Sequence, residues 1–128
     1  MVVIDTHVLI QDALEPARLS AKARRALEGN DGSLAASDIS LWVIAMLIAK
    51  GRVRPGADAA KFIERLLEAR AVAVLPITPA IAVVAQSEEF EHGDPSDRII
   101  AATAIVHGAQ LVSADARLKR MPGLRLLW

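Results

Sequence analysis

Short apolar runs of strand length alternate along this chain with longer segments that have the pattern of helices. The first run, Met1–Ile4, is continuous and rich in β-branched residues, which is typical of a strand buried on both faces. Further strands are predicted at Leu34–Ala36, Val72–Leu75, Gln110–Ser113 and Leu124–Leu127. Because helices separate most of these strands, we expect a three-layer α/β/α fold with a mostly parallel central sheet.

The predicted helices are marked by residues that favour helix ends. Ser20 and Asp58 are predicted N-caps, and a helix is predicted from Ile39 to Lys50. The sequence pattern that predicts a helix start most strongly is Asp94-Pro95-Ser96-Asp97. It has an N-cap, a proline in the first helical position and an acid in the first turn. The helix that follows reaches Val106 and is apolar on nearly all sides, so we expect it to be central and buried.

The composition limits the class of protein. A length of 128 residues suits one domain spanning residues 1–128, and a hydrophobic content of 53% excludes a disordered chain. There is no cysteine, which excludes thiolate metal sites and fits a reducing, cytoplasmic setting. No apolar stretch resembles a membrane-spanning helix of about 20 residues, so we expect no membrane association.

The net charge is zero, because 15 basic residues balance 15 acidic ones. This balance argues mildly against a non-specific nucleic-acid-binding protein, and the scarcity of aromatic residues argues against a base-stacking platform. The basic residues are nevertheless clustered, at Arg18, Lys22, Arg24 and Arg25, at Lys50, Arg52 and Arg54, and at Arg117, Lys119, Arg120 and Arg125.

Three aspartates are candidates for a shared site. Asp5 and Asp115 each follow a predicted strand, and the carboxyl ends of parallel strands form the usual ligand crevice of an α/β sheet. Asp97 lies in the first turn of the predicted buried helix. Carboxylates held close together repel one another unless a cation neutralises them. A divalent ion such as Mg²⁺ prefers oxygen ligands and can activate water for attack on a phosphodiester.

Each acid also has an ordinary structural interpretation. Asp5 could cap the helix that follows it, Asp94 could act only as an N-cap, and Asp97 could simply satisfy the helix dipole. The segment around Asp115 could be an ordinary turn. The joint pattern is more specific than any single residue. The histidines are scattered, and we expect surface or polar roles for His7, His92 and His107.

Several segments resemble the PIN-domain proteins of the VapC toxin group, in order and over essentially the whole chain. The matching segments are Val3-Ile4-Asp5-Thr6-His7-Val8-Leu9-Ile10, Ser37-Asp38-Ile39-Ser40-Leu41-Trp42, Leu75-Pro76-Ile77-Thr78, His92-Gly93-Asp94-Pro95-Ser96-Asp97-Arg98-Ile99-Ile100-Ala101-Ala102-Thr103-Ala104 and Leu111-Val112-Ser113-Ala114-Asp115.

The resemblance implies a ribonuclease toxin of a type II toxin–antitoxin system, dependent on Mg²⁺ or Mn²⁺. The metal-binding and catalytic residues would be Asp5, Asp97 and Asp115. Supporting roles would fall to Thr6, Ser113 and Asp94, and Arg98 is a candidate for binding the RNA backbone. The implied partners are a VapB-like antitoxin, an RNA substrate and a second copy of the chain in a homodimer.

One position departs from the family pattern, because Val43 stands where these proteins have a glutamate. An isopropyl group cannot bind metal, orient water or accept a proton. Asp38 lies five residues earlier, roughly 140° away around a helix, and is poorly placed to substitute. Ser40 is nearly on the same face but offers only a neutral oxygen.

Two functions remain open at this point. The first is an endoribonuclease toxin whose activity is attenuated by Val43. The second is a catalytically impaired domain that binds an antitoxin or RNA without cutting. A phosphatase with an aspartate nucleophile fits less well, because it needs a second aspartate where this chain has His7.

Overall fold

The sheet is built around the N-terminal strand. The computed structural model describes residues 1–30, 32–90 and 93–128. The strands are β1 (Val2–Ile4), β2 (Leu34–Ser37), β3 (Ala73–Leu75), β4 (Gln110–Val112) and β5 (Arg125–Leu127), in the order β3-β2-β1-β4-β5. All pairings in this sheet are parallel, which confirms the predicted parallel α/β sheet.

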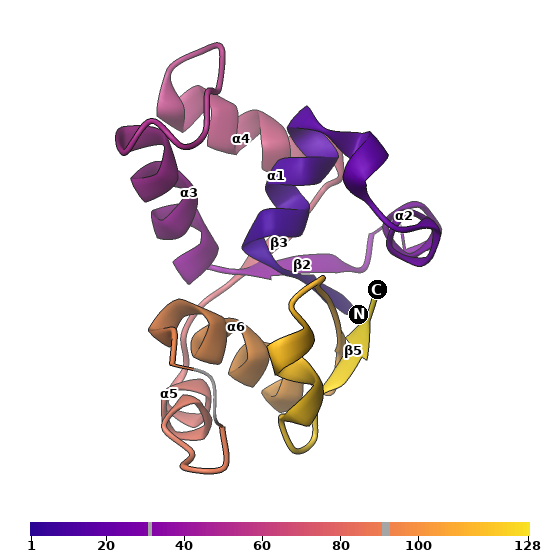
Figure 1. Cartoon of the computed structure of the whole chain (residues 1–128), viewed down its shortest axis with the longest axis vertical. Coiled ribbons are helices and arrows are strands. Elements are labelled where there is room, and N and C mark those ends of the chain that lie inside the picture. The colour runs from indigo at the N-terminus through magenta and orange to yellow at the C-terminus, as the bar shows by residue number, and fades with distance from the viewer. Residues whose placement is uncertain (31, 91–92) are drawn as a thin grey trace.

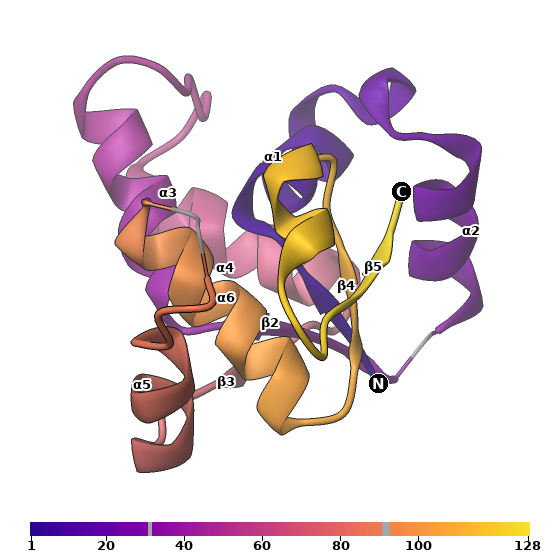
Figure 2. The ribbon, with the colours of Figure 1, turned by 60° about the horizontal axis from the view of Figure 1, so that its bottom comes forward.

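Helices cover both faces of the sheet (Figures 1 and 2). They are α1 (Thr6–Leu14), α2 (Ala21–Gly29), α3 (Ile39–Ala49), α4 (Ala59–Ala69), α5 (Pro79–Ala85) and α6 (Pro95–Val106), with 3₁₀ turns η1 (Pro16–Arg18) and η2 (Ala116–Arg120). Helices α1, α2 and α4 pack on one face, and α6 and η2 pack on the other. Helix α3 contacts both α4 and α6, and α5 packs against α6.

Alternation along β1 divides the core between the two faces. Val2 and Ile4 belong to the cluster under α1, α2 and α4, whereas Val3 packs with Ile100 of α6. Successive side chains of a strand point to opposite faces, so a strand covered on both sides must be apolar at every position. This arrangement explains the uninterrupted apolar run at the start of the chain.

The helix caps predicted at Ser20, Asp58 and Asp94 are confirmed, whereas the side chain of Asp5 makes no cap hydrogen bond to α1. The Ser20 hydroxyl accepts a hydrogen bond from the Ala23 N–H, and the Asp58 carboxylate accepts one from the Lys61 N–H. The Asp94 side chain accepts from the N–H groups of Ser96 and Asp97 at the start of α6. The short basic helix expected after Asp115 is a 3₁₀ turn, η2. No helix in the described ranges is long and apolar enough to cross a membrane.

The strand order places the candidate acids at one edge of the sheet. Chain connections leave β1 toward β2 on one side, while β4 returns to pair with β1 on the other. Ile4 lies opposite Val112 in this pairing, and the Asp5 N–H donates to the Val112 carbonyl at 3.0 Å. Asp5 and Ser113, which directly follow these paired residues, therefore lie next to each other at a switch point of the sheet, where ligands usually bind.

Candidate active site

Asp5 is a buried carboxylate with one unsatisfied oxygen. Its side chain is 5% exposed, and its Oδ2 accepts a 2.6 Å hydrogen bond from the Ser113 hydroxyl. Its Oδ1 is buried and has no hydrogen-bond partner among the described residues. Burial raises the pKa of Asp5, although the Ser113 hydrogen bond and the charge of His7 oppose that shift. A buried anion in this condition would be stabilised by a nearby cation.

Asp115 is linked to Asp5 through Ser113. The Ser113 hydroxyl accepts a 3.1 Å hydrogen bond from the Asp115 N–H while it donates to Asp5. The Asp115 carboxylate caps η2 at the Arg117 N–H and also binds the Arg117 guanidinium at 3.1 and 3.2 Å. The charge of Asp115 contributes to raising the pKa of Asp5, so the two carboxylates repel each other across Ser113.

A cavity of about 470 Å³ adjoins this acid pair at Thr6, the residue after Asp5. Asp94 and Asp97 line it from the start of α6, and Trp42 and Val43 line it from α3. The Thr6 hydroxyl donates a 2.8 Å hydrogen bond to the buried Ser40 hydroxyl. Segments that are remote in sequence therefore meet at the carboxyl end of β1.

The candidate acids do not form a closed ligand set in the described part of the chain. No three His, Asp or Glu side chains in the described ranges lie close enough together to form a metal site as they stand. Arg117 binds Asp115, and this hydrogen bond is the main cause that raises the pKa of Arg117; the charges of Asp97 and Asp94 add to it. The arginine thus partly neutralises Asp115.

The donor set fits a hard divalent cation. Its oxygen atoms come from carboxylates and a hydroxyl, which Mg²⁺ and Mn²⁺ accept, and the unsatisfied Asp5 Oδ1 is available to such an ion. Closure of the set around an ion would require Asp115 to release Arg117, because that guanidinium now occupies both of its carboxylate oxygens.

The PIN domain family matches residues 2–124. The chain belongs to the PIN-domain family. It is 40% identical over 119 residues to Ribonuclease VapC22 of Mycobacterium tuberculosis, with 92% of this chain and 89% of that protein covered. This similarity places the PIN domain among the VapC-like proteins and confirms the resemblance seen in the sequence motifs.

Solved structures confirm the PIN fold. VapBC2 from Rickettsia felis, bound to a promoter DNA fragment, matches with a TM-score of 0.76 at 18% identity and covers 98% of this chain and 97% of that chain. DNA-bound VapBC from Salmonella typhimurium matches with a TM-score of 0.72 at 16% identity, covering 98% and 95%. The predicted three-layer α/β/α architecture is therefore correct.

Val43, which the motif resemblance predicts to stand in place of a glutamate, lines the cavity of this PIN domain. Its side chain is only 8% exposed and lines the same space as Thr6 and Asp97. Ser40, one turn earlier, does not replace the missing carboxylate, because its hydroxyl is buried and bonded to Thr6. Val43 therefore gives this part of the cavity wall an apolar side chain with no oxygen ligand.

Arg98 has a structural environment that the sequence did not reveal. Its guanidinium donates hydrogen bonds to the carbonyl oxygens of Ala85 at 2.7 Å, Phe90 at 2.6 Å and Ser87 at 2.7 Å. It also lies 5.7 Å from the centre of the Phe90 ring. These contacts hold the backbone between Ala85 and Phe90 against the start of α6. RNA binding by Arg98 remains a prediction, but this geometry favours a structural role.

The structure brings together part of the predicted site. Asp5, Ser113 and Asp115 form one hydrogen-bonded group, and Thr6, Asp94 and Asp97 are associated with the adjoining cavity. The sequence interpretation did not single out Arg117 or the cavity position of Trp42. The sequence feature that could have predicted the role of Arg117 is its position two residues after Asp115, because this spacing favours a local ion pair. His92 lies outside the described residues.

Proposed function

We propose that this PIN domain is a metal-dependent endoribonuclease and the toxin of a VapBC-type toxin–antitoxin pair. The observation that carries the proposal is the buried Asp5 carboxylate, with an unsatisfied oxygen at the end of the central strand. Maintaining such a group costs folding free energy, and a cation-dependent site explains why the cost is kept. The 40% identity to a protein named as a ribonuclease supports the same activity.

Asp5, Asp97 and Asp115 would hold Mg²⁺ or Mn²⁺, which supplies an activated water and positive charge at the phosphodiester when bound. The other residues position these ligands. The Ser113 hydroxyl fixes the rotamer of Asp5 and holds the Asp115 backbone. Asp94 fixes the start of α6 and thereby the placement of Asp97. The site is on rigid elements of the fold, as precise chemistry requires.

We further propose a VapB-like antitoxin as the partner and a homodimer as the toxin's own assembly, acting in the cytoplasm. The solved relatives named above are VapBC complexes. Trp42 is 63% exposed at the cavity lined by the candidate acids, and Ile39 and Met46 line the same cavity. An apolar segment of an antitoxin could cover this surface and place an arginine near the acids.

Co-expression with the neighbouring antitoxin gene tests the partner, and light scattering of the purified toxin tests the dimer. A stable complex that is lost in Trp42→Ala but retained in Val83→Ala supports antitoxin binding at this surface. Val83 is a suitable control because it is highly exposed on α5 and does not line the cavity. A toxin that purifies alone from cells expressing both genes contradicts the partner, and a monomer contradicts the dimer.

A second function is favoured by Val43. With an isopropyl group in the wall of the cavity, the domain would keep its fold and its partners but cut RNA poorly or not at all. It would then act as an antitoxin-binding or RNA-binding module.

Cleavage assays separate the two functions. A panel of structured RNAs is incubated with Mn²⁺ and wild-type protein, Val43→Glu, Val43→Gln or Asp5→Asn. Cleavage by wild type that is lost in Asp5→Asn supports the nuclease. Cleavage by Val43→Glu alone, with Val43→Gln silent, supports the impaired module. If even Val43→Glu does not cut, the assignment of this site as a nuclease fails.

A further inference from the structure

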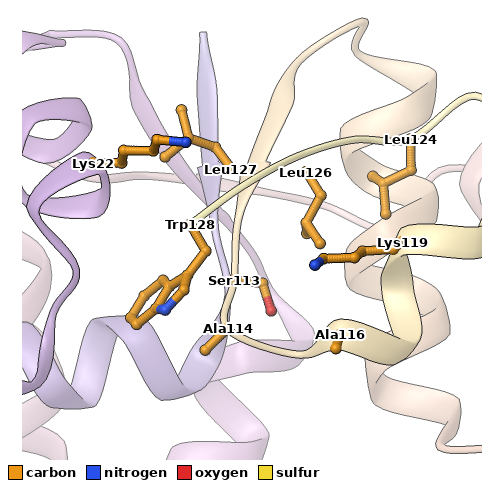
Figure 3. Close-up of a pocket in the computed structure, with 9 residues that line it drawn as sticks. All are labelled: Lys22, Ser113, Ala114, Ala116, Lys119, Leu124, Leu126, Leu127 and Trp128. Atoms are coloured by element: carbon orange, nitrogen blue, oxygen red, sulfur yellow. The ribbon is translucent and has the colours of Figure 1, made fainter.

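A second cavity is lined by Ser113, the residue that donates a hydrogen bond to Asp5. Its volume is about 660 Å³, and its walls come from α2, from the end of β4, from η2 and from the C-terminal residues (Figure 3). Ser113 lines this cavity and also donates to the Asp5 carboxylate, so one side chain belongs to both sites. The basic cavity, as we call it here, is thus directly adjacent to the proposed catalytic acids.

Two basic clusters that are far apart in the sequence meet at this cavity. Lys22 reaches in from α2 and Lys119 from η2, on opposite sides of Ser113 (Figure 3). No acidic residue lines the basic cavity, and neither lysine is paired with a carboxylate within the part of the chain that the structure describes. Two ammonium groups in one concave space attract an anion, and phosphate groups are a common partner of lysine.

The remaining walls of the basic cavity are apolar and aromatic. Leu126 and Leu127 contribute aliphatic surface, and the indole of Trp128 lies beside Ala114 (Figure 3). Trp128 is partly buried and packs against the core cluster that contains β1 and α2, so its ring is held in place. A fixed indole can stack on one nucleobase without selecting its identity. The scarcity of aromatics excludes a long stacking platform but not a single stacked base.

We propose that the basic cavity binds one nucleotide of single-stranded RNA next to the cleavage point. Lys22 and Lys119 contact the phosphates on either side of that nucleotide, and Trp128 stacks on its base. This inference rests on the proposed function, because it assumes that the substrate is RNA. It assigns the part of the substrate next to the scissile phosphodiester to the basic cavity, adjacent to Asp115.

The first test is RNA binding without cleavage. Anisotropy of a fluorescein-labelled single-stranded RNA of ten nucleotides is measured in EDTA for wild type, for Lys22→Ala/Lys119→Ala and for the control Lys50→Ala/Lys61→Ala. The control removes two exposed lysines that do not line the cavity. We expect the cavity variant to lose roughly tenfold in affinity and its log–log salt slope to fall by about 1.4, as for two lost phosphate contacts on a single strand.

The second test uses Trp128 as its own reporter. The chain has two tryptophans, so Trp42→Phe leaves Trp128 as the single fluorophore. Saturable quenching of this fluorescence by the unlabelled RNA supports stacking on Trp128. Absence of quenching while the RNA binds overturns the assigned base site, and equal affinity of the two lysine variants overturns the phosphate contacts.

The outcomes also distinguish a failure of the proposed nucleotide site from a failure of the proposed ribonuclease function. If no RNA binds to wild type in EDTA, or to Val43→Glu with Mn²⁺, the proposed function fails together with the inference. If RNA binds equally to cavity and control variants, only the inference fails. If the cavity variant binds RNA normally but no longer co-purifies with the antitoxin, the basic cavity is a protein-binding site and the nucleotide assignment is wrong.

Discussion

The hydroxyl of Ser113 donates a 2.6 Å hydrogen bond to the carboxylate of Asp5, 108 positions away along the chain. Both side chains are buried, and the bond crosses from the end of β4 to the end of β1. Hydrogen bonds to a charged group contribute more than neutral ones, and their loss leaves a buried charge unsatisfied. We therefore expect both the folding and the proposed activity to depend on this contact.

Ser113→Ala is expected to lower the free energy of unfolding by about 1–3 kcal/mol at neutral pH, because it leaves a second oxygen of Asp5 without a donor. Urea titrations measure the difference. Ser87→Ala is the control, since its hydroxyl accepts only an exposed 3.3 Å bond from the Glu89 N–H. Equal stabilities of wild type and Ser113→Ala would show that the Asp5 carboxylate does not need this donor.

Asp5→Asn is expected to raise stability at pH 7 in the absence of divalent ions, by about 1–2 kcal/mol as for other functional-site residues. Burial raises the pKa of Asp5 in the folded chain above its ordinary value of 3.8, so the folded state holds its proton to higher pH than the unfolded state. The contribution of Asp5 to the free energy of unfolding consequently falls as the pH rises from the unfolded-state pKa to the raised folded-state pKa. Above the folded-state pKa this contribution stays unfavourable.

The gain from Asp5→Asn should therefore shrink as the pH is lowered toward 3.8 and vanish where both states are protonated. Thermal melts from pH 3 to pH 8 measure it against Asp12→Asn, which instead loses an ion pair with Arg70. A gain that grows on acidification would contradict the raised pKa.

Arg117→Gln is expected to strengthen Mn²⁺ binding several-fold. Arg117 now binds both carboxylate oxygens of Asp115, so an ion must compete with it for that ligand. Calorimetric titration measures the affinity, with Arg120→Gln as a control on the same 3₁₀ turn. An unchanged or weaker affinity in Arg117→Gln would mean that Asp115 is not a metal ligand.

Val43→Glu is expected to lower stability by about 1–3 kcal/mol without metal, because it places a carboxylate in a buried position. Mn²⁺ should then raise the melting temperature of this variant more than that of wild type, since ligand binding to the folded state stabilises it. Val43→Gln has a similar shape without the charge and should show little metal response. An equal Mn²⁺ effect in all three proteins would exclude position 43 from the metal site.

Arg98→Lys is expected to destabilise the domain by at least about 2 kcal/mol, nearly as much as Arg98→Gln. A lysine keeps the charge but cannot reach the carbonyls of Ala85, Ser87 and Phe90 together. Urea titration checks stability, and RNA anisotropy checks the salt slope. Normal stability of Arg98→Lys, combined with a reduced salt slope in Arg98→Gln, would restore the role in RNA binding predicted from the sequence.

Local patterns predicted the elements of this fold well. The strand before Asp5 and the helix that begins at Asp94 are each determined by a few neighbouring residues, so both could be predicted from the sequence alone. The site was harder to predict, because contacts such as that of Thr6 with Ser40 depend on how helices pack. The roles of Arg98 and Arg117 depend on which acceptors the fold brings near, and the composition alone does not reveal these.

The order of the strands also has a consequence for biosynthesis. The strand β1 is synthesised first, yet its neighbour β4 and the Ser113–Asp115 segment come from the last part of the chain. A ribosome must deliver nearly the entire polypeptide before the central pairing can close, and such distant contacts form late in folding. The hydrogen-bonded group of Asp5, Ser113 and Asp115 can therefore assemble only after the residues up to Asp115 have been synthesised.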